Sequence, residues 1–232
     1  MVTSANAAAM PAPVDINLRE QVQQRLRLDI VSGEVGPGTI LSVPALARTL
    51  GISTTPVREA LLQLSADGLL QPLRNRGFCV VEPSLEELRN LFEVRLQLES
   101  SAFLKLVQSG CGDVSDLTVQ ADAIARAVRT GDVPLYLAAD RAFHQELLSR
   151  AGNPVLTGIV MKLRDTMRLY GIKSAAGLAR QAESVPEHYR IIEMVRQGAE
   201  PAAAAALMHK HIMDWEPIFS DVLLGDAGER VR

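Results

Sequence analysis

The sequence predicts a mainly α-helical protein in two parts: a small N-terminal part with three helices and one β-hairpin, and a larger C-terminal bundle built only of helices. Apolar residues recur at helical spacing along most of the 232-residue chain. Two short strand-like runs lie side by side in the sequence near residue 75, whereas glycine or proline separates the other segments. Hydrophobic residues make up 47% of the chain, enough for a sizeable core.

The N-terminal part is organised by residues 51–61, a tight turn followed by the start of a helix. Thr55 is expected to be the N-cap of this helix and Pro56 its first residue, where a missing N–H costs nothing. The helix is expected to run to residue 67 and to stop at Gly68. Apolar stripes predict two helices upstream, at residues 18–31 and 42–50. Two short helices joined by a glycine-containing turn are typical of a helix-turn-helix.

A β-hairpin is expected next, with strands at 69–73 and 78–81 joined by residues 74–77. Three helices and a hairpin make a winged helix-turn-helix, whose second motif helix enters the major groove of DNA. The hairpin turn is its wing, which reaches phosphates or a minor groove. The exposed candidates for DNA contact are Ser53, Thr54, Thr55 and Arg58 at the helix head, and Arg74 and Arg76 in the wing.

The C-terminal part begins at once, because Ser84 to Glu87 form a capping box. Helices are expected at about 85–108, 114–130, 134–151, 154–170, 186–198 and 201–217, with an irregular connection at 171–181. They predict an antiparallel bundle of six or seven helices. The expected organisation is a disordered tail at 1–14, the winged helix-turn-helix at 15–83, the bundle at 84–225 and a tail at 226–232.

Composition limits the partners of the chain. The formal net charge is −3, and residues 15–83 hold seven basic and seven acidic side chains, so DNA affinity must come from a few placed arginines and from dimerisation. Cys79 and Cys111 form no CxxC motif, which suits a reducing cytoplasm without a disulfide framework. No long apolar run or basic leader occurs, so we expect a cytoplasmic protein without a membrane partner.

Four side chains are candidate metal ligands. Asp140 and His144 are spaced i, i+4 and share one helix face, while His188 and His211 lie on two other expected helices. One carboxylate and three imidazoles can converge on a divalent metal in a bundle core. Imidazole suits zinc, nickel, copper and iron, and the carboxylate also admits manganese. By spacing alone, ordinary packed or surface histidines remain the alternative; His209, two residues from His211, is expected at the surface.

Residues 37–80, PGTILSVPALARTLGISTTPVREALLQLSADGLLQPLRNRGFCV, resemble the DNA-binding domain of GntR-type bacterial transcription regulators. Family members usually carry arginine where Thr54 stands here and often a charged residue where Pro44 stands, so the operator sequence stays open. By the resemblance, the DNA contacts are Ser53, Thr55 and Arg58, with Arg76 and Gly77 in the wing.

The stretch from Asp140 to His144, the residues AGNP at 151–154, Glu187-His188 and the alanine-rich run into His211 resemble the FCD effector domain, over about residues 84–225. Many such domains bind a metal through one aspartate and three histidines, and Asp140, His144, His188 and His211 match. The ligand chemistry favours zinc, with nickel or manganese as alternatives. As a transcription regulator, the chain is expected to act as a homodimer that places two recognition helices in the major grooves of a pseudo-palindromic operator.

Arg95, in Phe92-Glu93-Val94-Arg95, matches an arginine on the first long helix of this domain family. It can pair in bidentate fashion with a small carboxylate effector whose other end binds the metal. The alternative is a salt bridge between Arg95 and Glu99 at i+4.

These features favour a ligand-responsive transcription regulator, in the commoner mode a repressor released by its effector, and not an enzyme. A metalloenzyme on the helical bundle, such as a metal-dependent hydrolase, is the alternative from another class. It needs a general base near a metal-bound water, and the candidates are Glu146 and Glu187. In a third interpretation the metal only stabilises the fold.

Overall fold

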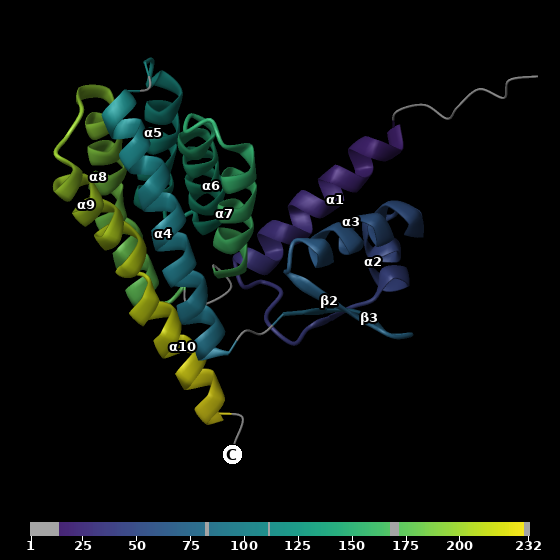
Figure 1. Cartoon of the computed structure of the whole chain (residues 1–232). Helices are drawn as coiled ribbons and strands as arrows, with labels where there is room; N and C mark the ends of the chain where they lie inside the picture. The colour runs from purple at the N-terminus through teal and green to yellow at the C-terminus, as the bar shows by residue number, and fades with distance from the viewer. Residues whose placement is uncertain (1–13, 82–83, 111, 168–171, 230–232) are drawn as a thin grey trace, which may run out of the picture.

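The computed structural model describes residues 14–81, 84–110, 112–167 and 172–229. Figure 1 shows the two expected parts: an upright bundle of helices and a smaller part beside it, with helix α1 reaching the bundle. The smaller part comprises, in chain order, α1 (Val14–Val31), β1 (Ile40–Leu41), α2 (Val43–Leu50), α3 (Thr54–Ala66), β2 (Leu70–Leu73) and β3 (Gly77–Val80).

The smaller part is a winged helix-turn-helix, as predicted. α1 packs against α3, and both helices bury one apolar stripe: Val22, Leu26 and Ile30 on α1, and Val57, Ala60, Leu61 and Leu64 on α3. The strands form an antiparallel sheet in the order β1-β3-β2. Strand β1 was not predicted, because two residues are too few to show an alternating pattern.

Helix α3 begins two residues earlier than predicted. Ser53, and not Thr55, is the N-cap, so the prediction of a Thr55 cap is wrong. Pro56 is therefore the third residue of the helix rather than the first. The fold accepts it there because none of the first N–H groups of a helix has an intrahelical acceptor, and the fixed φ of proline suits the helix.

The larger part contains seven helices within the described residues, at the upper end of the predicted range. In chain order they are α4 (Leu85–Ser109), α5 (Ser115–Thr130), α6 (Val133–Ser149), α7 (Pro154–Met167), α8 (Ala175–Gln197), α9 (Pro201–Met213) and α10 (Glu216–Glu229). α4 packs against α7, α8, α9 and α10, and α5 packs against α6 and α8. The predicted Ser84–Glu87 capping box starts α4.

Three predictions about the second half of the bundle are wrong. Pro186 lies inside α8 and does not open it, and residues 175–181 are helical rather than irregular. Ser174 caps α8 by accepting the N–H of Gly177 at 3.0 Å, so the helix is anchored well before the proline. A proline removes only one helical hydrogen bond, which buried side chains on both sides outweigh. The single last helix that was expected is two, α9 and α10, with Pro217 as the second residue of α10.

Some predictions fall on residues outside the described ranges: most of the tail at 1–14, the boundary at Pro83, Cys111 and the end of the helix predicted to reach residue 170. Helix α1 begins at Val14 and α10 runs to Glu229, so both extend beyond the expected bounds. None of the described helices combines the length and the apolar character that a membrane span requires.

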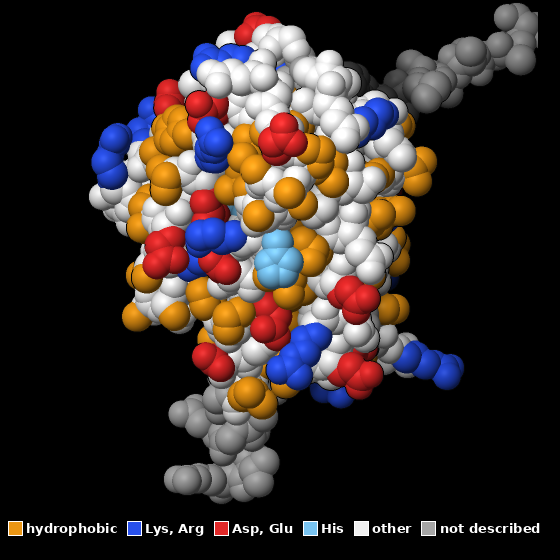
Figure 2. Space-filling model, turned by 60° about the vertical axis from the view of Figure 1, so that its left-hand side comes forward, with side chains coloured by type: hydrophobic (Ala, Val, Ile, Leu, Met, Phe, Trp, Pro, Cys, Tyr) orange, Lys and Arg blue, Asp and Glu red, His pale blue; other side chains and the backbone are white. Residues whose placement is uncertain are grey.

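The surface of the bundle carries both signs of charge. On the face shown in Figure 2, Lys and Arg side chains lie among Asp and Glu side chains, with hydrophobic side chains between them. A mixed surface of this kind makes no extended positive field of the sort that draws in nucleic acid. This face of the bundle is therefore not expected to contact DNA.

Candidate metal centre and DNA-contacting surface

Helices α6, α8 and α9 bring the predicted ligands together in the core of the bundle. One nitrogen each of His144, His188 and His211 lies within 4.8 Å of the others. His211 Nε2 is 3.2 Å from His144 Nε2, and His188 Nε2 is 3.2 Å from Asp140 Oδ1. Asp140 Oδ1 is also 3.7 Å from His144 Nε2. All four side chains are buried, so the cluster is a closed polar site inside an apolar bundle.

The outer nitrogens of the histidines fix their orientation. His188 Nδ1 donates to the backbone carbonyl of Ser184 at 2.8 Å, and His211 Nδ1 donates to Glu187 Oε2 at 2.8 Å. His144 Nδ1 is buried and faces Glu99 Oε2 at 3.9 Å, which favours a proton on that nitrogen. Each Nε2 is then left with its lone pair directed into the cluster, the arrangement in which imidazoles bind a metal.

The resulting contacts fit a cation. With these tautomers, the contacts His144–His211 and His188–Asp140 each join two acceptor atoms 3.2 Å apart. Two acceptors at that distance repel each other unless a positive charge lies between them. Three imidazoles and one carboxylate are a donor set that zinc accepts, and nickel and manganese accept it as well. The residues present therefore fit a divalent metal ion.

Burial keeps two of the histidines neutral. It lowers the pKa of His144 well below its usual range, and the guanidinium of Arg164 lowers it further. Burial also lowers the pKa of His211 to about 3, although the hydrogen bond to Glu187 opposes this shift. Neutral imidazole is the form that binds a metal ion, so these two histidines are in the metal-binding form at neutral pH.

A layer of ion pairs surrounds the cluster and was only partly anticipated. Arg164 donates to Asp140 Oδ2 at 2.9 Å and to Glu99 Oε2 at 3.0 Å, and Arg180 donates to Glu187 Oε2 at 2.7 Å. The sequence did carry a signal for Arg164. It lies on the same helix stripe as the buried residues Val160 and Met167, where a charged side chain needs a partner.

Arg95 makes the salt bridge that was the alternative prediction and also lines a cavity. Its Nε donates to Glu99 Oε1 at 2.7 Å. Burial lowers the pKa of Arg95 to about 10 and the charge of Glu99 opposes the shift, so the guanidinium stays charged at neutral pH. The cavity has a volume of about 20 Å³ and is lined by Arg95, Tyr136, Asp140, Arg164, Ile172, His211, Trp215 and Phe219.

The two candidate general bases have other partners. Glu187 accepts from His211 and Arg180; although burial raises its pKa, these two hydrogen bonds lower it well below the usual range. Glu146 pairs with Arg150 at 2.9 Å on the surface side of α6. Both carboxylates are therefore already held by cationic side chains. His209, expected at the surface, is exposed.

The DNA-contact candidates gather on one side of the smaller part. Ser53, Thr54, Thr55 and Arg58 are exposed at the head of α3, and Arg74 and Arg76 are exposed in the turn between β2 and β3. A groove of about 560 Å³ joins these two regions, and its lining includes Arg58, Asn75 and Arg76. Guanidinium groups at both ends of one groove suit contact with the backbone and base edges of a duplex.

Gly77 has a structural reason for being glycine. Its φ is +114°, and a Cβ built there would lie 2.3 Å from the carbonyl oxygen of Leu41. Strand β3 pairs with β1 at this point, with Leu41 opposite Phe78. A side chain at residue 77 would push β1 off the wing, so any contact of Gly77 with DNA must use its backbone.

Comparisons with known proteins agree with both parts. The family model "Bacterial regulatory proteins, gntR family" matches residues 18–80, and the FCD domain model matches residues 90–214. The HTH-type transcriptional regulator LutR of Bacillus subtilis is 30% identical over 226 residues, which cover 88% of this chain and 100% of LutR. The gluconate operon transcriptional repressor of the same organism is 27% identical over 174 residues, covering 75% of this chain and 70% of the repressor.

A solved structure shows the same fold. A GntR-type transcriptional regulator from Rhodococcus sp. RHA1 superposes with a TM-score of 0.72 at 24% identity, over 90% of this chain and 98% of that one. The matching families and the relatives named above are transcriptional regulators and not enzymes. The chain therefore belongs to the GntR family of bacterial transcriptional regulators and carries an FCD domain.

Proposed function

We propose that this regulator is a repressor that holds a divalent metal, preferably zinc, at Asp140, His144, His188 and His211, and that it leaves its operator when a small organic acid binds beside the metal. The observation that carries the proposal is that the Nε2 atoms of all three histidines point into the cluster. The Nδ1 contacts set this orientation: the Ser184 carbonyl for His188, Glu187 for His211 and Glu99 for His144. Bound there, the metal supplies a positive charge and a coordination position for an anion. The gluconate relative is named a repressor, which supports the direction of the response.

Charge balance supports an anionic effector. The buried cations and anions around the site are equal in number: Arg95, Arg164 and Arg180 against Glu99, Asp140 and Glu187. A divalent metal among neutral histidines adds two uncompensated positive charges to this buried site. Because an unpaired buried charge is costly, an anion that joins the metal is strongly favoured. Arg95, which already lines the adjoining cavity, is placed to receive a carboxylate.

The structure also sets a condition on that effector. A cavity of about 20 Å³ holds about one water molecule and not an organic acid. Two aromatic side chains near the C-terminal end, Trp215 and Phe219, line it. Phe219 lies on α10, and Trp215 directly precedes that helix. We infer that α10 moves aside when the acid enters.

Effector binding is expected to change the fluorescence of Trp215, the one tryptophan of the chain. Zinc-loaded protein titrated with acetate, succinate and citrate should respond to at least one of them. Arg95→Lys keeps the positive charge beside Glu99 but loses the planar guanidinium that can bind a carboxylate through two hydrogen bonds. The affinity for that acid should therefore fall by about tenfold, in line with the loss of one charge-assisted hydrogen bond. Fluorescence titration and calorimetry measure both.

Two results would contradict this part of the proposal. One is the absence of any response to carboxylates in protein shown to hold zinc. The other is equal effector affinity with and without zinc, combined with a lower melting temperature after chelation. The second result would assign the metal a structural role only.

A homodimer is supported by an apolar surface on two neighbouring helices. Val94 on α4, and Val155 and Ile159 on α7, are 42%, 70% and 46% exposed, and the two helices pack side by side. Half-exposed Leu91 and Leu98 continue the stripe on α4, and Leu91 and Val94 also line the hollow between α4 and the sheet. Exposed apolar patches on a protein surface mark candidate association surfaces. A symmetric dimer through this face would present two α3 helices to two half-sites.

Arg58→Ala is expected to weaken operator binding by about 1–3 kcal/mol per half-site, because a base-edge contact is lost. Arg76→Ala should instead lower the slope of log affinity against log salt by about one, as expected for a phosphate contact. The probe is a duplex selected from a random-sequence pool by the full-length protein, in gel-shift and footprinting assays. Footprints over two half-sites would support the dimer.

Arg196→Ala is the matched control, because Arg196 is exposed at the far end of α8 in the bundle. It should leave both affinity and salt slope unchanged. Equal losses from Arg58→Ala and Arg196→Ala would argue against α3 as the reading element.

A further inference from the structure

The metal cluster and the DNA-binding part are joined by two consecutive pairs of opposite charges. Asp140 and Arg141 are neighbours on α6, and Arg164 and Asp165 are neighbours on α7. Inside the bundle, Arg164 donates to the metal-ligand candidate Asp140 at 2.9 Å. One residue further along both helices, Arg141 donates to Asp165 Oδ1 at 3.2 Å. The same two helices therefore carry one pair in the site and one pair at the edge of the bundle.

Arg27 of α1 connects that outer pair to helix α3. One amino group of Arg27 donates to the second carboxylate oxygen of Asp165, and the other donates to Asp67, the C-cap residue of α3. The side chains of all three are largely buried, at 13%, 4% and 9% exposure. A carboxylate at the C-terminal end of a helix opposes the helix dipole, so a nearby cation stabilises Asp67. Lys162 of α7 lies 3.7 Å from Asp67 Oδ1 and adds a second, more exposed cation beside Arg27.

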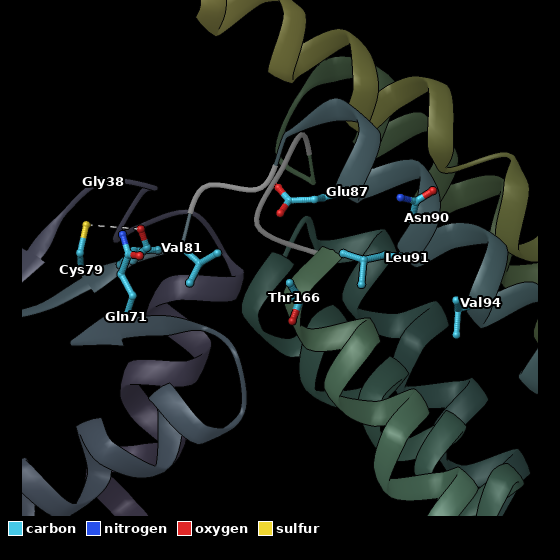
Figure 3. A pocket seen from close by; sticks show the side chains of 10 residues that line it. Gly38, Gln71, Cys79, Val81, Glu87, Asn90, Leu91, Val94 and Thr166 are labelled. Atoms are coloured by element: carbon cyan, nitrogen blue, oxygen red, sulfur yellow. Dashed lines mark hydrogen bonds between the residues drawn. The ribbon is translucent and has the colours of Figure 1, made fainter. Parts of the chain in front are cut away.

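The surroundings of this bridge are open on both sides. A cavity of about 600 Å³ separates the sheet from α4 and is lined by Gln71, Cys79, Leu91, Val94 and Thr166, among others (Figure 3). A groove of about 390 Å³ lies on the other side, between α1 and α6, with Arg27 and Arg141 in its lining. These hollows leave space beside the bridge for the two parts to shift relative to each other.

We propose that Arg27 and Asp165 transmit the state of the metal pocket to helix α3. The proposal rests on the proposed function, because it assigns a route for regulation by that same pocket. Arg164 holds its place through Asp140, which faces the metal site, and through Glu99, which lies 3.9 Å from the outer nitrogen of His144. A metal that draws Asp140 toward itself moves Arg164, and Asp165 moves with it as the next residue of α7. The hydrogen bond from Arg27 to Asp67 then changes, and the C-terminal end of α3 rotates relative to the bundle.

The test compares DNA affinity with and without zinc in matched variants of the full-length protein. Arg27→Met keeps much of the apolar stem and removes the guanidinium. Asp165→Asn keeps the Arg27–Asp67 pair and weakens the bonds of residue 165 to Arg27 and to Arg141. Arg25→Met is the control, because Arg25 lies on the same helix with its side chain 72% exposed. The DNA probe is the selected duplex, and the metal is removed with a chelator and restored as zinc alone.

In the wild-type protein, zinc should change DNA affinity by a factor in the range of about 5–150, which is usual for coupled sites. In Arg27→Met and Asp165→Asn this factor should fall to within about twofold of unity, while zinc content stays stoichiometric and DNA is still bound. Arg25→Met should keep the wild-type factor. If Arg27 had only a structural role, Arg27→Met would lower the DNA affinity equally with and without zinc. The ratio of these two affinities would then equal that of the wild type.

A wild-type factor retained in both variants would overturn the proposed route while leaving the metal and DNA sites intact. A wild-type protein that binds zinc and DNA independently of each other would overturn it as well. Failure of the wild-type protein to bind zinc or any selected duplex would instead refute the function proposed above. Hydrogen exchange at the end of α3 gives a second reading, since zinc should alter it in the wild type and not in Asp165→Asn.

Discussion

His188→Gln is expected to lower zinc affinity at least about 100-fold, because changes to partners of metal ligands alone already cost about 10–100-fold. His188 is fully buried, and its Nδ1 is held by the carbonyl of Ser184, so its Nε2 cannot be replaced by a neighbouring side chain. Metal analysis of the purified protein and titration against a competing chelator measure the effect. The wild type should hold one metal ion per chain.

His209→Gln is the matched control for this experiment. His209 lies two residues before His211 on the same helix but is exposed to solvent, so zinc affinity should be unchanged. Zinc content in His188→Gln equal to that of the wild type would show that the cluster is an ordinary set of packed histidines.

Thermal stability gives an independent reading of the same site. A ligand that binds only the folded state stabilises it by about 2.7 kcal/mol at 100 times its dissociation constant. Zinc should therefore raise the melting temperature of the wild type and of His209→Gln, and have little effect on His188→Gln. A similar rise in all three proteins would point to a different zinc site.

The sequence was most informative where the signal is local. Asp140 and His144 share a face because of their i, i+4 spacing, and the exposed head of α3 follows from one apolar stripe and one turn. The capping box at Ser84 was equally readable, since its two hydrogen bonds join residues three apart. In such cases the interacting groups are within one helical turn, and no knowledge of tertiary contacts is needed.

The position of a proline did not predict where helix α8 begins. Pro186 was expected to open a helix, but Ser174 caps α8 twelve residues earlier and the buried side chains of Arg180 and Gln181 hold the intervening turns. Local preference favours an end at proline, while burial of the flanking turns favours continuation. Only the packed structure shows which effect is larger.

The long-range ion pairs could not be derived from the sequence. Arg164 and Glu99 are 65 residues apart, and Arg27 and Asp165 are 138 apart. The volume of the cavity beside Arg95 depends on how α10 packs, which no spacing encodes. For this reason the sequence anticipated a carboxylate-binding arginine but not the closed state of its pocket.

Arg164→Met is expected to destabilise the metal-free protein by about 3–5 kcal/mol, the usual result of removing one partner from a buried ion pair. Arg164 is 4% exposed and is bonded to two carboxylates that are themselves buried, Glu99 and Asp140. Burial alone raises the pKa of Glu99, but Arg95 and Arg164 together reverse that shift and hold it below the usual value. Without Arg164, the carboxylates lose a cation that methionine cannot replace. Arg126→Met, at an exposed position on α5, should change stability by less than about 0.5 kcal/mol.

Zinc should restore more stability to Arg164→Met than it adds to the wild type. In the wild type the metal enters a site whose buried charges are already balanced, whereas in the variant it meets a net negative charge and neutralises Asp140 directly. Denaturant unfolding with and without zinc measures this difference. Equal zinc effects in the two proteins would mean that Arg164 and the metal do not share the carboxylates. A larger effect in the variant would show that Arg164 and the metal contribute to one buried charge balance, which stabilises the bundle.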